Sequence, residues 1–569
     1  MARIVIDPVT RIEGHLRIEA AVENGKVVDA WSSGQMFRGI EIILKGRDPR
    51  DAWLFCQRIC GVCTTCHALA SVRAVENALG MTIPDNARIM RNIISAVQLV
   101  HDHIVHFYHL HALDWVDVLS ALKADPARTA SIARSISDWP NSRAAFFGSV
   151  QKRVKGLADT GQLGPFANGY WGHPAYKLPP EVNLLGVAHY LEALDVQRSL
   201  VKVHAILGSK NPHLQTFLVG GMARPVDPNS QNAINADAIA LMSQVAKQTV
   251  DFVGKVYLPD VLAIASYYKE WADIGAGIGN YMTYGEFPKD NRSNTDNMLI
   301  PKGIILKKDL TKMVPVDQQK ISEHVTRSWY SYGEGDTRGK HPWEGETAAK
   351  YTGPRPPYDH LDTQAKYTWL KAPRYEEMPM EVGPLARVLV AYASDHKRAK
   401  ETVDSALGKL GVGAGALFST LGRVAARCIE TVITAEAMPG FIDELAGTVS
   451  KGDYLICQTD KWEPRTWPKE AKGYGFSDAP RGALGHWVSI KDGKIANYQM
   501  VVPSTWNLSP RDGKGVRGAM EQSLIGTPVA DPERPLEILR TVHSFDPCVA
   551  CAVHVTDAGG RPITVVKRG

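Results

Sequence analysis

The sequence has no long apolar run and no concentrated block of one charge. No stretch approaches the roughly 18 uncharged apolar residues of a membrane span, and Met1 to Asp7 reads as a short strand, not as an export signal. We therefore expect a chain with neither a signal peptide nor a membrane anchor of its own. Lysine plus arginine number 65 against 60 for aspartate plus glutamate, without any long basic run. This balance argues against nucleic acid as the main ligand.

Cysteine is also scarce. The eight cysteines are too few to stabilise a chain of 569 residues by disulfides. Most of them fall into two clusters, which are Cys56, Cys60, Cys63 and Cys66 near the start and Cys548 and Cys551 near the end. Such clustering indicates metal binding or redox chemistry. Cys428 and Cys457 stand alone, and we predict that they are small buried side chains.

The apolar pattern predicts a mainly helical protein. Apolar residues recur every three or four positions in several segments with few helix breakers. This pattern indicates helices at 51–79, 86–122, 184–207, 232–257 and 384–445. Between them, 165–180 and 290–373 are rich in glycine, proline and aromatic residues, which is typical of long ordered loops.

Small β elements are expected near both ends. Alternation around Asn24-Gly25 and around Asp492-Gly493 predicts hairpins at 16–32 and 485–499, and a weaker one is expected at 554–566. The chain is long enough for a large buried core, and no repeat or flexible linker divides it. The predicted class is therefore α+β, mainly α with small β elements, in one large domain.

Two CxxC pairs carry the clearest chemical signal. In Arg58-Ile-Cys60-Gly-Val-Cys63 and Asp546-Pro-Cys548-Val-Ala-Cys551 the two cysteines stand at i and i+3, where one turn brings both sulfurs to the same side. Together the pairs would make a site of four thiolates. Sulfur ligation suits zinc, an iron-sulfur cluster or a soft redox-active metal, so the ligand type alone leaves all three open.

The spacing between the pairs favours a cofactor over structural zinc. Zinc knuckles usually stabilise small modules with ligands close in sequence, whereas nearly the whole chain separates these pairs. A second alternative, one or two redox-active disulfides, lacks the βαβ setting that such a dithiol normally occupies.

The cysteine motifs and the N-terminal motif resemble those of a known family. The pattern RxCGxC early and DPCxxCxxH late, with Arg11-Ile-Glu13-Gly-His15, is similar to large subunits of nickel-iron hydrogenases, especially the membrane-associated respiratory group. Further similar stretches lie at 33–39, 101–103, 166–174, 479–482 and 503–507, so the likeness runs along the whole chain. It implies the large-subunit fold, with a helical core and β-hairpins near both termini.

The resemblance implies two sets of metal ligands. Nickel would be held by four thiolates, with Cys60 and Cys548 terminal, while Cys63 and Cys551 also bridge to an iron that carries carbon monoxide and cyanide. A magnesium-like ion near the C-terminus would take its ligands from Glu41, His554 and the backbone carbonyl of Met500.

The same resemblance assigns the groups around the metals. Glu13 would receive a proton from Cys548. Arg481, with Asp102 and Asp546, would overhang the open metal position and orient a ligand there, since arginine is very hard to deprotonate.

Four further residues would surround the centre. Pro503 and Ser504 match positions around a cyanide ligand, where a hydroxyl can donate a hydrogen bond. His67 follows Cys63 by four residues and is expected to hydrogen-bond a cysteine sulfur. Cys66 matches a position that varies among relatives. Two roles remain open for it, that of a chemically inert side chain and that of a site of oxidative damage.

The segment from His101 to His111 is rich in histidine. His106 and His109 share a helical face and would be able to bind a metal, but we predict packing and hydrogen bonding for the set His101, His103, His106, His109 and His111.

The resemblance also implies processing and partners. The mature catalytic domain would be 1–554, and 555–569 resembles an extension that a maturation endopeptidase removes after nickel-insertion factors have acted. With no spare cysteine set for clusters, the chain would need an iron-sulfur small subunit as obligate partner, and indirectly a membrane electron-transfer subunit. The pair would lie on the periplasmic side of the cytoplasmic membrane, exported with the small subunit.

The expected activity is reversible oxidation of H2 to protons and electrons, and uptake is the expected physiological direction. Two relatives of another kind are the alternatives: a regulatory hydrogen sensor, which generally lacks the cleaved tail, and a nickel-free coupling subunit like that of complex I, which lacks the complete cysteine set.

Overall fold

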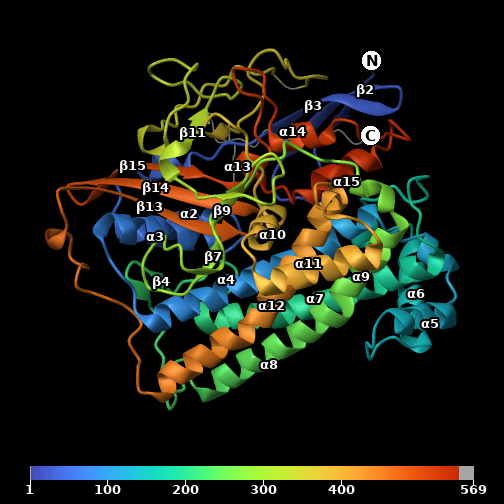
Figure 1. Cartoon of the computed structure of the whole chain (residues 1–569), viewed down its shortest axis with the longest axis horizontal. Helices are drawn as coiled ribbons and strands as arrows, with labels where there is room; N and C mark the ends of the chain where they lie inside the picture. Colours follow the sequence, from blue (N-terminus) through green and yellow to red (C-terminus); the bar gives the residue numbers. More distant parts are fainter. Residues whose placement is uncertain (1, 356, 550–569) are drawn as a thin grey trace.

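A bundle of four long helices forms the centre of the molecule. The computed structural model describes residues 2–355 and 357–549, and within them four helices pack against one another across the lower half of Figure 1. They are α4 (Asp85–Val105), α7 (Pro180–Gly208), α8 (Ala236–Phe252) and α12 (Thr420–Ser450). The periodic apolar residues predicted helix in each of these segments, and their buried faces make the largest hydrophobic cluster.

Several of the predicted helical stretches are interrupted. α4 ends at Val105 and passes into a π-helical segment, His106–His111, which is followed by short 3-10 turns. The stretch that begins at Pro384 contains three helices, because α10 (Pro384–Ala393) and α11 (Lys397–Leu410) end before α12 begins. Asp395 and Gly411, with φ angles of 57° and 66°, turn the chain at the two corners. Apolar spacing continues across such corners, so it does not reveal them.

The two ends of the chain share one hydrophobic core. β1 (Ala2–Ile6), β2 (Leu16–Glu23) and β3 (Lys26–Gly34) form an antiparallel sheet, with the predicted turn at Asn24-Gly25. α14 (Ala519–Leu524) packs on β3, and α15 (Leu536–Ser544) packs on α14. Buried residues from both ends lie in this core, among them Leu16, Ile18, Met520, Ile538 and Val542. The C-terminal segment is thereby brought back to the N-terminal strands.

A second antiparallel sheet carries α3 on one face. It consists of β13 (Glu470–Ala479), β14 (Gly482–Lys491) and β15 (Lys494–Val501), with the predicted hairpin at Asp492-Gly493. α3 (Cys66–Leu79) packs on β13 and β14. The approach is so close that a Cβ added at Gly475 would lie 2.2 Å from the carbonyl oxygen of Ala70. The glycines of β13 therefore fix the position of α3.

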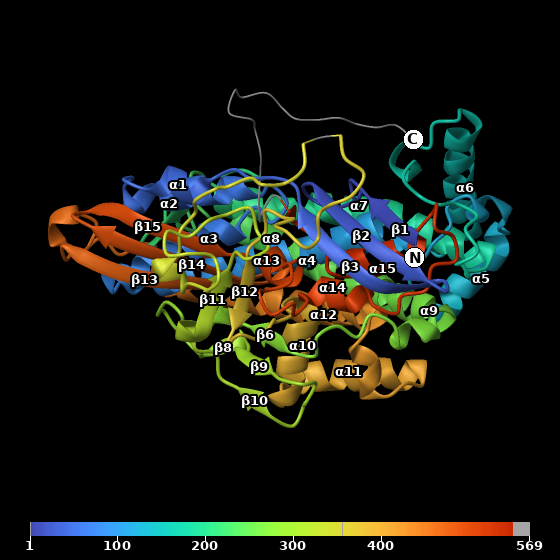
Figure 2. The same ribbon diagram turned by 90° about the horizontal axis from the view of Figure 1, so that it is seen from above.

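Two helices that we did not predict form a hairpin at one edge of the molecule (Figures 1 and 2). They are α5 (Pro126–Ile136) and α6 (Ala144–Asp159). The start of α5 had a readable signal, because Asp125 caps it by accepting from the backbone N–H of Ala127 and Pro126 occupies its first turn.

The remaining elements are short. The helices are α1 (Ile40–Leu44), α2 (Ala52–Cys56), α9 (Leu258–Tyr267) and α13 (Pro503–Asn507). The strands are β4 (Phe217–Leu218), β5 (Gly221–Met222), β6 (Tyr281–Thr283), β7 (Glu286–Pro288), β8 (Met298–Ile300), β9 (Gly303–Ile305), β10 (Met313–Val314), β11 (Ile321–His324) and β12 (Ala372–Tyr375). Several of these strands interrupt the predicted loop at 290–373.

The α+β class is confirmed, with helices predominating and the strands confined to small sheets. Among the described residues, none of the helices combines the length and apolar character that crossing a membrane requires. The weak hairpin expected at 554–566 lies outside the described residues.

Candidate metal centre

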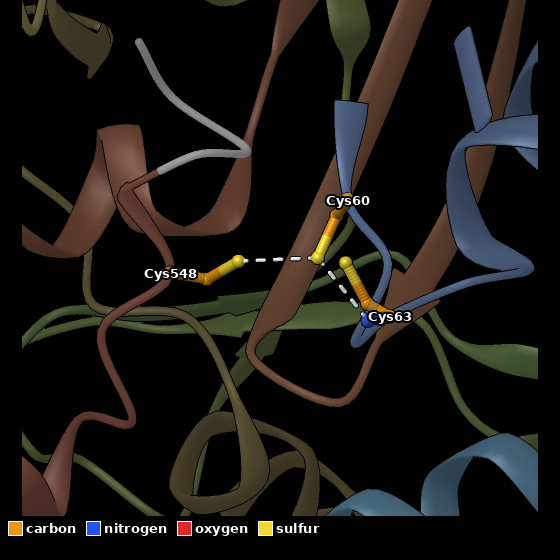
Figure 3. A group of neighbouring side chains, drawn as sticks. All are labelled: Cys60, Cys63 and Cys548. Carbon is orange, nitrogen blue, oxygen red and sulfur yellow. Dashed lines mark hydrogen bonds between the residues drawn. The ribbon is translucent and has the colours of Figure 1, made fainter. Parts of the chain in front are cut away.

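Three of the four predicted thiolates meet in the interior (Figure 3). The sulfurs of Cys60, Cys63 and Cys548 all lie within 4.8 Å of one another, and all three residues are buried. The sulfurs of Cys60 and Cys548 are 3.5 Å apart, although 488 positions separate the residues in sequence. Cys551, the fourth predicted ligand, lies outside the described residues.

The first pair sits in a break between two helices. α2 and a 3-10 turn end at Ile59, Cys60 is extended with φ −140°, and α3 begins only at Cys66. The backbone N–H of Cys63 donates to the sulfur of Cys60 over 3.2 Å. The continuous helix predicted for 51–79 is therefore interrupted at the very segment that presents the sulfurs.

The N-terminal motif holds the segment around Cys548 by its backbone. Glu13 and Cys548 form an isolated parallel bridge, in which the N–H of Val549 donates to the carbonyl oxygen of Glu13 over 2.8 Å. The N–H of Cys548 donates to the hydroxyl of Ser504 over 3.0 Å. The sulfur of Cys548 lies 3.3 Å from a carboxylate oxygen of Glu13. The structure thus brings Glu13 to the sulfur with which the sequence paired it.

A buried arginine spans two carboxylates beside the sulfurs. Arg481 donates to Asp102 over 3.1 Å and to Asp546 over 2.9 Å. Burial alone would lower the pKa of Arg481, but Asp546, Cys548 and Asp102 raise it well above its ordinary value. The guanidinium is therefore a fixed positive charge. Burial raises the pKa of Asp546, against the opposing effect of Arg481.

These groups line one small cavity. Its lining consists of Cys63, Cys66, His67, Ala479, Arg481, Leu484, Val502, Pro503, Ser504 and Cys548. Of the residues predicted to surround the centre, Cys66, His67, Arg481, Pro503 and Ser504 are in the lining, whereas Glu13, Asp102 and Asp546 are not. Convergent, buried sulfur beside a small cavity suits a soft metal, which binds thiolate and keeps it deprotonated. The donor set therefore fits a nickel-iron pair.

His67 is joined to residues that the sequence did not suggest. Its Nδ1 lies 3.0 Å from Nε2 of His486, and Nδ1 of His486 lies 2.8 Å from the hydroxyl of Tyr498. Burial lowers the pKa of His67 to about 4. The hydrogen bond predicted from His67 to a cysteine sulfur remains a prediction.

The second predicted metal site is built around Glu41. One carboxylate oxygen accepts from the N–H of Met500 over 2.8 Å, and the other accepts from the hydroxyl of Thr347. His554 lies outside the described residues, and the Met500 carbonyl remains a prediction.

Sequence reasoning missed the charged residues beside Glu41. Lys371 donates to Glu323 over 3.1 Å and to Gln499 over 3.0 Å, and Gln499 also contacts Thr347. Burial raises the pKa of Glu323 to about 7. Burial would lower the pKa of Lys371, but Glu323 and Glu41 raise it overall. These residues come from separate elements without a local motif, so no signal in the sequence pointed to them.

The histidine-rich segment is used for packing and hydrogen bonding, as predicted. Nε2 of His106 donates to the carbonyl oxygen of His543 over 2.6 Å, whereas Nε2 of His109 donates to that of Tyr190 over 3.0 Å. His106 and His109 therefore point at different elements. Among residues 2–355 and 357–549, the three cysteines are the convergent group of metal-binding side chains.

Comparison with known proteins identifies the family. The family model for nickel-dependent hydrogenase matches residues 38–554. The uptake hydrogenase large subunit of Bradyrhizobium diazoefficiens is 52% identical over 581 residues, covering 99% of this chain and 97% of the relative. The hydrogenase-1 large chain of Escherichia coli K12 is 48% identical over 582 residues, covering 100% and 97%.

Solved structures agree with the sequence relatives. A [NiFeSe] hydrogenase variant from Desulfovibrio vulgaris Hildenborough has a TM-score of 0.76 and 37% identity, covering 97% of this chain and 99% of that one. The enzyme from Desulfomicrobium baculatum has a TM-score of 0.75 at 34% identity, covering 97% and 100%. This chain belongs to the nickel-dependent hydrogenase family, in which it is a catalytic large subunit.

Proposed function

We propose that Cys60, Cys63, Cys548 and Cys551 hold the nickel-iron centre at which this chain oxidises H2 to protons and electrons. Cys60 and Cys548 would hold nickel alone, and Cys63 and Cys551 would hold both nickel and an iron that carries carbon monoxide and cyanide. The convergence of three buried sulfurs from the two ends of the chain is the observation that carries this assignment. The bound metals supply the polarisation of H2 that no side-chain base achieves unaided.

Glu13 takes the proton away from the centre. Its carboxylate oxygen lies 3.3 Å from the sulfur of Cys548, within reach for transfer along a hydrogen bond. Its backbone is fixed to Val549 and Pro547, so the carboxylate and the sulfur keep their relative position. Main-chain bonds thus serve a proton-transfer role by holding donor and acceptor together.

Arg481 positions the substrate side of the cavity. Its two carboxylate partners fix the orientation of the planar guanidinium and favour its charged form. The raised pKa of Arg481 disfavours a role as base. We assign to it the orientation of small ligands in the cavity. Pro503 and Ser504 also line the cavity, where they would surround a cyanide ligand.

A magnesium-like cation occupies the Glu41 region. Its ligands are Glu41, the Met500 carbonyl and His554, and water completes the set. The polar surroundings support this proposal, because Glu323, Lys371 and Gln499 form a buried hydrogen-bonded group beside Glu41 that would bind the cation's waters.

The cellular role is hydrogen uptake. Relatives of about half identity are named uptake hydrogenase large subunits, which favours an enzyme of energy metabolism over a hydrogen sensor. The electrons pass to an iron-sulfur small subunit in an obligate heterodimer and onward to a membrane subunit. The pair lies on the periplasmic side of the cytoplasmic membrane. Nickel-insertion factors and an endopeptidase that removes 555–569 produce the mature domain 1–554.

One experiment tests the centre directly. Nickel, iron and zinc are measured in the purified heterodimer, together with the infrared bands of metal-bound carbon monoxide and cyanide. We expect nickel with iron and both kinds of band in the natural protein, and loss of nickel in Cys63→Ser. Zinc without bands, or full nickel retention by Cys63→Ser, would overturn the assignment.

A further inference from the structure

The loop that carries Glu13 has little regular structure of its own. The backbone N–H of Val9 donates to the carbonyl oxygen of Leu16, so residues 9–16 form a closed loop between β1 and β2. None of residues 10–15 belongs to a helix or a strand, and Glu13 makes only an isolated bridge. The shape of this loop therefore depends on contacts with other elements.

Arg11 takes an unfavourable backbone conformation in the loop. Its φ angle is 57°, in the left-handed region that residues with a side chain rarely adopt. Its guanidinium donates to the carbonyl oxygen of Leu110 over 2.5 Å and to the carboxylate of Asp114. Asp114 is fully buried in a 3-10 turn that follows α4. This ion pair thus holds the strained part of the loop against the helical bundle.

His543 on α15 connects the same carboxylate to the loop. Its Nδ1 lies 2.6 Å from the second oxygen of Asp114, and its Nε2 lies 2.9 Å from the carbonyl oxygen of Thr10. The side chains of His543 and Asp114 are both buried. Because α15 leads directly into the segment that presents Cys548, one imidazole joins the Thr10 end of the loop to the helix before the sulfur.

The contacts of this imidazole require a proton on both nitrogens. A carbonyl oxygen only accepts hydrogen bonds, so Nε2 donates to Thr10. Burial would raise the pKa of Asp114, but the charge of Arg11 and then that of His543 lower it overall, so the carboxylate is ionised and also only accepts. His543 is therefore an imidazolium, and hydrogen bonds from such a cation are stronger than neutral ones.

The loop is held at a second point, beside the centre. The N–H of Val549 donates to the carbonyl oxygen of Glu13 over 2.8 Å, and the Glu13 carboxylate lies 3.3 Å from the sulfur of Cys548. A displacement of the other end of the loop would tilt this carboxylate relative to the sulfur. Neither Asp114 nor His543 is in the lining of the cysteine cavity, so the cavity would keep its shape.

We propose that Asp114 and His543 are positioning residues that hold the Glu13 carboxylate at proton-transfer distance from the sulfur of Cys548. The proton leaves that sulfur and binds a carboxylate oxygen of Glu13, and neither positioning residue takes it up. A small misplacement of a reacting group is enough to slow such a transfer steeply. This inference rests on the proposed role of Glu13 as proton acceptor.

The test uses His543→Asn in the purified heterodimer. The asparagine amide still faces Asp114 but is too short to reach the carbonyl oxygen of Thr10. We expect kcat for hydrogen oxidation to fall by about 10- to 100-fold, the scale for a small misplacement of a reacting group. The KM for H2 and the nickel content should not change, because the cavity keeps its lining.

A second readout is specific for the transferred proton. This proton originates in the substrate, so turnover with D2 reports on its transfer from the sulfur to Glu13. The ratio of the rate with H2 to the rate with D2 should be larger in His543→Asn than in the natural protein, because the transfer then limits turnover. General loosening of the fold would lower the rate without raising this ratio. An unchanged ratio would overturn the proposal.

His189→Asn is the matched control. His189 is also buried, and its Nδ1 lies 2.8 Å from a buried carboxylate, that of Asp260. This pair joins α7 to α9, and neither residue is in the lining of the cysteine cavity. The control should keep the kcat and the isotope ratio of the natural protein. Equal effects in both variants would assign the loss to the removal of a buried histidine and would overturn the positioning role.

A double variant separates this inference from the proposed proton path. In a Glu13→Gln background, His543→Asn should change kcat little, since no carboxylate remains to be positioned. Full additivity of the two losses would overturn the inference and leave the role of Glu13 intact. If Glu13→Gln alone leaves kcat unchanged, the proposed acceptor role fails, and this inference fails with it.

A milder variant covers the case in which His543→Asn yields no metal-loaded heterodimer. Arg11→Lys keeps a positive charge beside Asp114 but loses the second hydrogen bond, the one to Leu110. It must raise the isotope ratio in the same direction for the proposal to stand.

Discussion

The protein places two very different candidate sites near β15. The cysteine centre offers convergent sulfur, a small cavity and one arginine held by two carboxylates. The Glu41 region offers oxygen and nitrogen groups in a dense buried network around Lys371. Two residues of β15 make contacts to these regions. Met500 donates its N–H to Glu41, and Tyr498 forms a hydrogen bond with His486, the partner of His67. Soft and hard ligands are thus gathered in two separate groups, which suits two metals of different chemistry.

The cysteine centre is expected to be essential for nickel binding and for hydrogen oxidation. Cys548→Ser should abolish nickel binding and lower hydrogen oxidation by at least about 10³-fold, since the reaction has no route without the metal. Metal analysis and a hydrogen-uptake assay measure both effects. Cys457→Ser is the matched control, because this half-buried cysteine lies outside the centre. Equal nickel in the two variants would contradict the prediction.

The second prediction concerns proton transfer alone. Glu13→Gln keeps the size of the side chain but removes its ability to accept a proton from Cys548. Hydrogen oxidation should fall by about 10²–10⁴-fold, as for other positioned acid-base groups. Nickel content should not change. Activity within about twofold of the natural protein would remove Glu13 from the proton path.

A change in the shape of the cationic group at Arg481 is expected to lower turnover less than the loss of the Glu13 carboxylate. Arg481→Lys retains a positive charge but cannot bridge Asp102 and Asp546 with a planar fork. Turnover should decrease by about 10²-fold with metal content unchanged, which is the scale for loss of one oriented donor. If turnover were unaffected, charge alone would be sufficient in the cavity.

At the Glu41 region, we expect a substitution to change the thermal stability of the protein and not its reaction. Glu41→Gln should lose the bound cation and lower the thermal midpoint, by the equivalent of about 2.7 kcal/mol if the cation is normally present at 100 times its Kd. Calorimetry with added magnesium measures this, and the natural protein treated with a chelator is the control. A midpoint unchanged by both chelator and substitution would argue against a cation there.

A pH dependence of stability is expected at Glu323. Burial raises the pKa of Glu323 from 4.5 to about 7 in the folded protein, so folding favours its protonated form. The free energy of unfolding should therefore decrease as pH rises from about 4.5 to about 7, by on the order of 3 kcal/mol in cation-free protein. Glu323→Gln should flatten this slope, which chemical denaturation at several pH values would show. An identical slope in the variant would assign the dependence to other groups.

The sequence revealed the residues that belong to compact motifs. The cysteine pairs, Glu13 and Arg481 each stand in a short recognisable segment, and the described members meet in one cavity or beside it. Lys371, Glu323 and Gln499 could not be found in this way, because separate strands and loops bring them together.

His486 and Tyr498 show the same limit more sharply. Alternation predicted their hairpin correctly, yet the contact between them depends on which residues face each other across β14 and β15. Its extension to His67 depends on how closely α3 approaches, which the small residues of β13 decide. A one-residue slip in register would turn the phenol away.

The bridge between Glu13 and Cys548 has a consequence for the synthesis of the protein. Cys60 leaves the ribosome early, but its partner sulfur is 488 positions later in the chain. The second half of the centre, and the strand-like clamp that holds it, therefore do not exist until almost all of the polypeptide has been translated. Factors that deliver metal must wait for a nearly finished chain, and messages truncated even shortly before Asp546 will yield protein that cannot be loaded.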